Sequence, residues 1–201
     1  MTTSTQPITP AETALLIMDV QPSIVAMRDA ADTARLMPKL QTLREAARTA
    51  GVMVIYVVVG FRPGHPEIGD SNLMFGQIKA NGRLVEEDVH PDIAPGPGEI
   101  VVRKRRISAF CGSDLGVILR AHRIQHLVLT GIATSGVVLS TLREAADLDY
   151  RLTVIEDCCL DGDPEVHRVL TGKVFPRQAE VIMATRFDDF AKGLQRPLHR
   201  S

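Results

Sequence analysis

Residues 52–59 read Val-Met-Val-Ile-Tyr-Val-Val-Val, the longest apolar run of the chain and the clearest indication of its fold. The run is rich in β-branched residues, which favour a strand, and it contains no charged residue that would turn one face to water. Such strands are typical of parallel sheets covered by helices on both faces. The run is also far shorter than the roughly 20 residues that a membrane-spanning helix requires.

Similar short apolar runs recur on both sides of this segment, separated by longer amphipathic stretches. We expect strands over residues 14–18, 52–59, 100–103, 126–130, 152–155 and 179–183. We expect helices over residues 33–50, 113–122, 136–148 and 164–173, the last one beginning at an Asp-Pro pair suited to a helix start. The alternation predicts an α/β protein with three layers, α/β/α, built on a six-stranded, mostly parallel sheet.

Length and composition predict one cytoplasmic domain spanning residues 1–201. Residues 1–10 form a polar extension without the pattern of a secretory signal, and we expect a frayed tail after Leu194. The net charge of −1 gives no field that would attract nucleic acid or an anionic membrane, so neither is expected as a partner. Three cysteines, two of them adjacent, cannot form a disulfide framework, which favours a reducing compartment.

The segment 60–98 interrupts the alternation of strands and helices. It is rich in proline and contains only one short helical candidate, near residues 72–80. A long excursion within a compact domain is usually an active-site loop or an interface arm. Because it also carries Leu73, Met74, Phe75 and Ile78, we expect a homo-oligomer, a dimer or larger, that assembles through this segment.

Asp19 is the first candidate for chemistry, because ligands of parallel α/β sheets bind outside the carboxyl ends of the strands. It follows the first strand in Leu16-Ile-Met-Asp-Val-Gln-Pro22. A carboxylate directly behind apolar residues is partly desolvated, which raises its pKa unless a cation lies nearby. The alternative is that Asp19 caps a helix beginning after Pro22, and on this feature alone both interpretations stay open.

Lys104 follows the third strand within Arg103-Lys-Arg-Arg106. Side chains alternate along a strand, so Lys104 points opposite to Arg103 and Arg105 and can face the pocket while its neighbours face solvent. A basic cluster can also form a nucleic-acid patch. The strand-end interpretation is favoured because no aromatic residues are interleaved and the rest of the chain is not basic.

The third candidate is the turn after the fourth strand, Gly131-Ile-Ala-Thr-Ser-Gly-Val-Val-Leu-Ser-Thr141. Small residues at the start of a helix leave backbone N–H groups directed at the pocket, where they can bind an anion or an oxyanion. The alternative is an ordinary turn in which Thr134 or Ser135 caps the helix. On that interpretation Val137 belongs to the core.

These three motifs together resemble the isochorismatase-like, or cysteine hydrolase, superfamily over roughly residues 13–184. They are Asp19 after an apolar strand, Lys104 in Lys-x-x-x-Ser-Ala-Phe110, and Gly131-x-Ala-Thr leading to Val-x-x-Thr141. The resemblance implies an aspartate base, a lysine that orients groups or stabilises charge, and a cysteine nucleophile. The position of that cysteine falls on Val137, which carries no nucleophile, so a thioester cannot form there.

The resemblance also implies contacts to a small-molecule substrate. We assign these to Ala133, Gly136, Phe110 and His65, and we expect a non-proline cis peptide bond at Ile132–Ala133. Relatives that use zinc cluster a carboxylate and histidines after the second strand, whereas this chain offers only His65 there. We therefore expect no metal and no cofactor, and we interpret His126 as structural.

Two functions fit these residues. The first is a hydrolase of a small anionic molecule that uses Asp19 as acid or base, without a thiol, to cleave a vinyl ether or a C–N bond, with Lys104 holding a substrate carboxylate. The second is a catalytically silent member that binds a small metabolite or serves as an oligomeric scaffold. A relocated nucleophile, Cys111, or Cys158 or Cys159 after the fifth strand, is a weaker alternative, because adjacent buried cysteines usually act as small apolar residues.

Overall fold

The computed structural model describes residues 8–86 and 88–194, so most of the predicted N-terminal extension and the tail after Leu194 lie outside the described residues. One sheet organises this part of the chain, with all pairings parallel and the strand order β3-β2-β1-β4-β5-β6. The strands are β1 (Thr13–Met18), β2 (Met53–Val59), β3 (Ile100–Lys104), β4 (His126–Ile132), β5 (Arg151–Leu160) and β6 (Glu180–Ile182). The prediction of a six-stranded α/β sheet is confirmed.

Helices connect and cover the strands. They are α1 (Pro22–Val25), α2 (Ala30–Ala50), α3 (Leu73–Ala80), α4 (Leu115–Ala121), α5 (Leu139–Asp147), α6 (Pro164–Val169) and α7 (Phe187–Leu194). A helix near Pro22 was considered only as the alternative interpretation of Asp19, and it is the single turn α1; the sequence did not predict α7. None of the helices in the described ranges combines the length and the hydropathy that crossing a bilayer requires.

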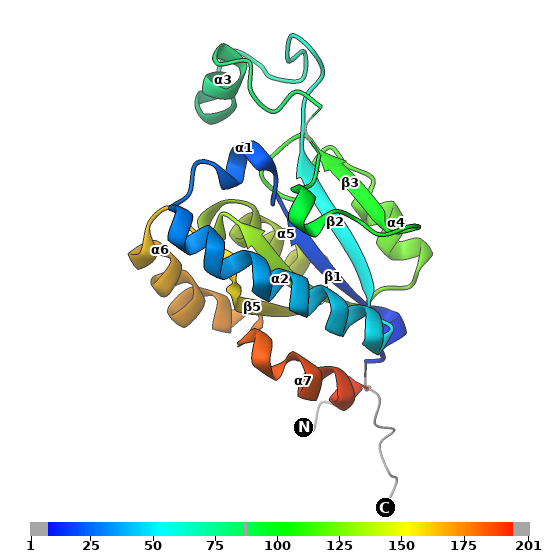
Figure 1. The fold of residues 1–201 in the computed structure, drawn as a ribbon. Coiled ribbons are helices and arrows are strands. Elements are labelled where there is room, and N and C mark those ends of the chain that lie inside the picture. The colour runs from blue at the N-terminus through cyan, green and yellow to red at the C-terminus, as the bar shows by residue number, and fades with distance from the viewer. Residues whose placement is uncertain (1–7, 87, 195–201) are drawn as a thin grey trace, which may run out of the picture.

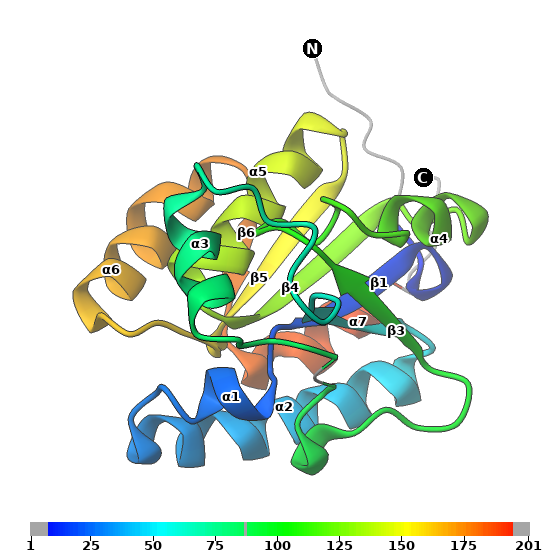
Figure 2. The same ribbon diagram turned by 90° about the horizontal axis from the view of Figure 1, so that it is seen from above.

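The helices cover both faces of the sheet, as the apolar strands require. Helices α2 and α7 pack on one face, where Leu40 and Phe187 belong to the same buried cluster, while α4 and α5 pack on the other, where Leu119 and Leu142 are buried (Figures 1 and 2). Burial of both faces explains why β1 consists entirely of residues that are closed to solvent. The result is the expected arrangement of three layers.

The strand order changes direction between β1 and β4. From β1 the chain builds outward through β2 and β3, then returns to add β4, β5 and β6 on the other side. In open α/β sheets this switch point leaves a crevice at the carboxyl ends of the two central strands. Asp19 follows β1, and the turn that begins at Ala133 follows β4, so both candidate segments meet there.

Strand β5 is longer than predicted, and this changes the position of two cysteines. The pairing of β4 with β5 shifts after Leu129 and resumes where Gly131 pairs with Cys159. The irregularity allows the strand to continue through Glu156 and Asp157 to Leu160. Cys158 and Cys159 therefore lie within β5, not after it as the sequence suggested.

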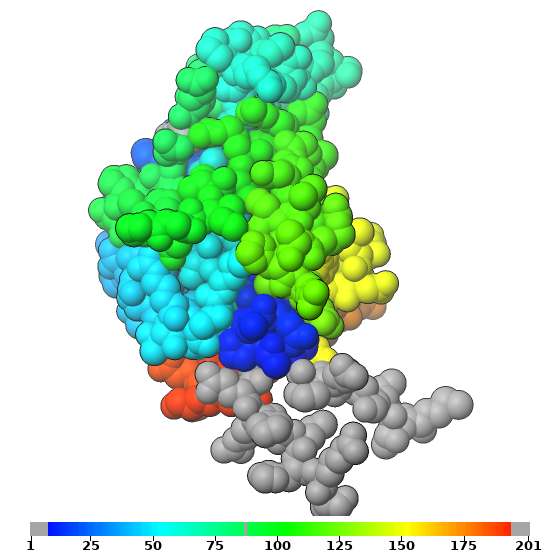
Figure 3. All heavy atoms as spheres, turned by 90° about the vertical axis from the view of Figure 1, so that its right-hand side faces the viewer, coloured from blue at the N-terminus to red at the C-terminus, as the bar shows by residue number. Residues whose placement is uncertain are grey.

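The excursion between β2 and β3 projects from the carboxyl end of the sheet and carries α3 (Figures 1 and 3). Arginines from the basic cluster connect it to the sheet: Arg103 pairs with Asp88 at 3.0 Å, and Arg105 donates a hydrogen bond to the carbonyl of Gly60. The expectation that these neighbours of Lys104 simply face solvent was therefore wrong. Arg103 and Arg105 instead hold the excursion against the sheet through these contacts.

Candidate active site

A cavity of about 150 Å³ opens at the switch point and brings together residues from five parts of the chain. Its charged lining consists of Asp19, Arg28 and Lys104. The rest is apolar and consists of Ile24, Met27, Val59, Met74, Phe75, Ile78, Leu84, Ile107, Ile132, Ala133, Gly136 and Val137. The side chains predicted to share one pocket, those of Asp19, Lys104 and Val137, do line the same cavity.

Asp19 and Lys104 form a buried ion pair at the base of this cavity. The Lys104 Nζ lies 2.9 Å from the Asp19 Oδ2, and the two side chains are 2% and 9% exposed. Lys104 is the last residue of β3, on the same side as the buried Val102, so alternation along the strand directs it inward as predicted. Asp19 does not cap α1, whose N-cap position is Gln21.

The Asp19 carboxyl combines an altered pKa with an unused oxygen. Burial raises its pKa to about 6, and the neighbouring Lys104 cation opposes that increase without cancelling it. The Oδ1 atom is buried and has no hydrogen-bond partner. A group of this kind changes charge near neutral pH and has one oxygen left to exchange a proton with a bound molecule, as general acid–base catalysis requires.

Lys104 has no donor left for a ligand. Its ammonium group makes contacts to the Asp19 carboxylate, to the Arg106 carbonyl at 3.0 Å and to the Ile107 carbonyl at 2.9 Å. An ammonium group carries three N–H donors, and these acceptors engage all of them. The expectation that Lys104 holds a substrate carboxylate is therefore not met in this structure, where the ammonium group contacts Asp19 and two backbone carbonyls instead.

The turn after β4 begins with a close approach of two strands. Gly131 pairs with Met18 and has φ +135°, and a Cβ there would lie 2.1 Å from the Met18 carbonyl oxygen. Only glycine fits this position. The cis peptide bond predicted at Ile132–Ala133 is present.

The backbone N–H groups of the turn are more fully engaged than predicted. Gly136 and Val138 both donate to the Ala133 carbonyl, at 3.1 and 3.2 Å, and Ser135 donates to Asp161 at 2.6 Å. Thr134 does not cap the helix; its hydroxyl lies 2.8 Å from the His167 Nδ1. The helix start is thus an irregular turn held by neighbouring loops, and these three N–H groups are not free for an oxyanion.

Val137 occupies the end of the cavity where the resemblance places a cysteine. It is 2% exposed and belongs to the apolar cluster under α4 and α5, so it is both a core residue and a lining residue. Ala133 and Gly136 from the same turn also line the cavity. No cysteine lines this cavity in the part of the chain that the structure describes.

The structure does not bring His65 and Phe110 to the cavity lining. The His65 ring is buried, lies 5.5 Å from the Phe61 ring and has its Nε2 2.7 Å from the Arg83 carbonyl oxygen. Phe110 stacks on Tyr150 at a ring distance of 6.0 Å. His65 thus packs within the excursion, and Phe110 packs on the residue that precedes β5.

The cysteines are poorly placed to replace a missing nucleophile. Burial raises the pKa of Cys158 far above its ordinary value and that of Cys159 to about 12, so neither forms the reactive thiolate at neutral pH. Cys111 is exposed outside the cavity lining. Among residues 8–86 and 88–194, no cluster of three or more His, Cys, Asp or Glu side chains is arranged to hold a metal ion.

Two residues near the site gave no signal in the sequence. The Gln21 side chain donates to the Val59 carbonyl at 3.0 Å and accepts from the Val59 N–H at 2.7 Å, which joins the segment after β1 to the end of β2. Arg28, beyond α1, reaches the cavity from the side. Both lie in a short connection where the chain has no periodic pattern to interpret.

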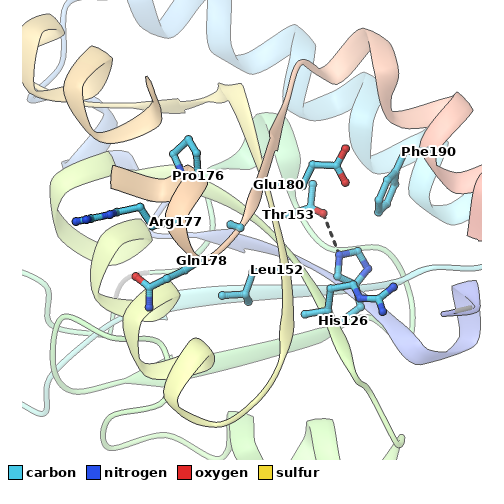
Figure 4. A pocket seen from close by; sticks show the side chains of 10 residues that line it. His126, Leu152, Thr153, Pro176, Arg177, Gln178, Glu180 and Phe190 are labelled. Atoms are coloured by element: carbon cyan, nitrogen blue, oxygen red, sulfur yellow. Dashed lines mark hydrogen bonds between the residues drawn. The ribbon is translucent and has the colours of Figure 1, made fainter. Parts of the chain in front are cut away.

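A second hollow, of about 380 Å³, lies at the opposite end of the strands around His126 (Figure 4). His126 is the first residue of β4, and its ring nitrogens lie 3.3 Å from the Thr13 hydroxyl and 3.0 Å from the Thr153 hydroxyl. Burial lowers its pKa to about 4, which keeps it neutral. These contacts support the interpretation of His126 as a structural residue.

Comparison with known proteins extends over most of the chain. The isochorismatase domain family matches residues 13–186. The ureidoacrylate amidohydrolase RutB of Caulobacter vibrioides is 34% identical in an alignment that covers 79% of this chain and 81% of the relative.

Solved structures share the architecture. A cysteine hydrolase from Pseudomonas syringae pv. phaseolicola superposes with a TM-score of 0.83 at 22% identity, covering 96% of this chain and 100% of that chain. An N-carbamoylsarcosine amidase from Thermoplasma acidophilum superposes with a TM-score of 0.70 at 27% identity, covering 86% of this chain and 96% of that chain.

Proposed function

Because the chain belongs to the isochorismatase family, we propose that it is a hydrolase of a small anionic molecule that works through Asp19 and water, without a cysteine nucleophile. The observation that carries the proposal is the buried Asp19 carboxyl. It faces the cavity beside Lys104, has an unpartnered oxygen and a pKa of about 6. Val137 occupies the position where a family member with a thiol would carry it.

The bond most consistent with the relatives is a C–N bond, because two of them are an amidohydrolase and an amidase. In the proposed reaction, Asp19 accepts a proton from water as the water oxygen attacks the carbonyl carbon of the substrate. The C–N bond then breaks, and the proton passes from Asp19 to the departing nitrogen. The products are a carboxylic acid and an amine, and Asp19 returns to its ionised form.

In this proposal Lys104 is a positioning residue. It holds one oxygen of Asp19 in place and favours its ionised form by its charge, so that the other oxygen can act as a base near neutral pH. Cleavage of a vinyl ether would instead require Asp19 to be protonated. The two reactions therefore predict opposite changes in rate as pH rises through about 6.

The test is a turnover assay on a panel of small N-acyl and N-carbamoyl acids, repeated after treatment with iodoacetamide and accompanied by intact-protein mass spectrometry. We expect turnover that survives alkylation, and no covalent adduct during turnover. Stoichiometric loss of activity on alkylation of Cys111, Cys158 or Cys159, or an acyl-protein adduct, would refute the water mechanism.

A second candidate is a member that binds a small metabolite without converting it, which the valine at position 137 favours. Saturable binding of panel members with no turnover at any pH would support it over hydrolysis. The retained buried pair of Asp19 and Lys104 argues for catalysis, because ionised groups are costly to keep in the interior.

We also propose that the protein forms a homo-oligomer through the excursion that carries α3, and that it resides in the cytoplasm. Leu73 is 84% exposed and Met74 is 52% exposed, which is unusual for large apolar side chains on one short helix. All three cysteines are free thiols, consistent with a reducing compartment.

A further inference from the structure

The cavity contains a second cation, Arg28, whose position is not explained by packing alone. Its Nε atom is buried and has no hydrogen-bond partner, although the residue lines the cavity beside Asp19. No carboxylate of residues 8–86 and 88–194 forms an ion pair with its guanidinium group. Burying an unpaired donor of a charged group is costly unless a ligand satisfies it.

The other cations around the cavity are already occupied. Lys104 uses its donors on Asp19 and two carbonyls, as described above. Arg83 contacts the Ser23 carbonyl and the Met27 sulfur. Arg106 donates to the Glu67 carbonyl and lies over the Phe75 ring. Among the described residues, Arg28 is thus the cation that lines this cavity and has a buried N–H donor without a hydrogen-bond partner.

Gly162, in the loop after β5, makes room for the arginine. A Cβ at this position would lie 2.6 Å from the Arg28 Nη1 atom. The Arg28 side chain therefore extends from the segment after α1 to the loop after β5. The absence of a side chain at position 162 is what allows it to lie there.

We propose that Arg28 binds the anionic group of the substrate and makes the site select carboxylates over their neutral analogues; this rests on the proposed function. The guanidinium fork suits a carboxylate, which can accept two parallel hydrogen bonds. The apolar lining accommodates the rest of the molecule. An apolar cavity of about 150 Å³ is large enough for a molecule of roughly the size of benzene, so the substrate is a compact carboxylic acid.

Benzoate and benzamide are a suitable pair of probes, because their ring matches this size and they differ mainly in the charge of the attached group. Calorimetric titration of the wild-type chain should show benzoate binding about 10-fold or more tightly than benzamide, the size expected for a hydrogen bond to a charged group. The Arg28→Met variant should lose that preference and keep its affinity for benzamide. Arg35→Gln, which removes an exposed arginine on α2 that pairs with Asp32, is the matched control and should bind as the wild type does.

Gly162→Ala provides a second variant that keeps the charge. The added methyl group displaces the flexible end of Arg28 and should weaken benzoate binding several-fold, with little effect on stability. Equal binding of benzoate and benzamide by the wild type, unchanged benzoate binding by Arg28→Met, or no benzoate binding at millimolar concentration would each overturn the proposal. Because binding is measured without turnover, a failure of the hydrolase proposal alone would leave the benzoate preference intact.

Discussion

At the scale of single residues, the site depends on how one carboxyl group is held. Asp19 has φ +56°, a left-handed conformation that aspartate adopts more readily than most residues, and it turns the chain away from β1 just where Lys104 ends β3. Its native pKa of about 6 exceeds the ordinary value of 3.8, a difference that corresponds to about 3 kcal/mol.

The sign of this difference determines its effect on stability. The folded protein binds the Asp19 proton more tightly than the unfolded chain does. Its contribution to stability is therefore complete below about pH 4 and is lost as pH rises through about 6. At neutral pH the fold carries an ionised buried carboxylate at a cost, which is expected of a group kept for chemistry.

The Lys104→Met variant tests how Lys104 acts on Asp19. It removes the cation that opposes the effect of burial, so the pKa of Asp19 should rise by a further unit or more. If Asp19 is a base, the rising limb of the pH–rate profile should move to higher pH by the same amount. Turnover at pH 7 should fall about 2-fold or more, because half or more of the Asp19 carboxyl would then be protonated.

Lys39→Met is the matched control, because Lys39 of α2 pairs with Asp157 of β5 and does not line the cavity. Its profile should coincide with that of the wild type. A limb that stays near pH 6 in Lys104→Met would show that this lysine does not set the ionisation of Asp19.

Asp19 and Lys104 were predictable from the sequence because both stand at the carboxyl ends of apolar strands, where ligands of parallel sheets bind. Arg28 was not predictable, because the connection between α1 and α2 has no periodic pattern. The path of the loop determines whether a residue in an irregular connection reaches the pocket. The type of side chain alone does not predict that path. The same limit explains His65, whose loop directs its ring toward Arg83 and away from the cavity.

At the scale of elements, the close approach of β1 and β4 aligns the two halves of the site. Gly131 has φ +135° at the end of β4, with the Met18 carbonyl where a side chain would start. The Gly131→Ala variant should force the strands apart beside Asp19 and destabilise the fold by about 3 kcal/mol. Thermal or denaturant unfolding measures this directly.

Gly76→Ala is the control for that variant. Gly76 lies in α3 and has no positive φ, and a methyl group added to it would meet no other atom within 4 Å. Alanine there should leave stability unchanged or raise it by about 0.5–1 kcal/mol, because alanine favours helix. Equal effects of the two substitutions would contradict the role given to Gly131.

The strands were predictable because their apolar runs match the pattern of a doubly covered sheet. The end of β5 was not, since Glu156 and Asp157 interrupt its apolar run while the backbone continues to pair after a register shift. The turn after β4 was placed correctly, but its local geometry depends on acceptors from distant segments, such as Asp161. Long-range contacts of this kind cannot be inferred from the local sequence pattern.

At the scale of the whole molecule, large apolar side chains of α3 in the excursion remain exposed in the described part of a single chain. Its inner side chains, including Phe75 and Ile78, line the cavity, while Leu73 points to solvent. Multi-angle light scattering at micromolar concentration should give a mass of at least twice 22.0 kDa. The Leu73→Glu variant should lower that mass, and a wild-type monomer would contradict assembly through this segment.

The most direct test of the account is the pH–rate profile of Asp19→Asn beside that of the wild type, on whichever small carboxylic amide the panel identifies. Asparagine keeps the shape of the side chain and removes its titrating proton. We predict that turnover at pH 7 falls about 100-fold or more and that the rising limb near pH 6 disappears, whereas Asp70→Asn, which alters an exposed carboxylate paired with Lys79, changes neither. Wild-type turnover in Asp19→Asn, with the limb still in place, would contradict the assignment of Asp19 as the acid–base group.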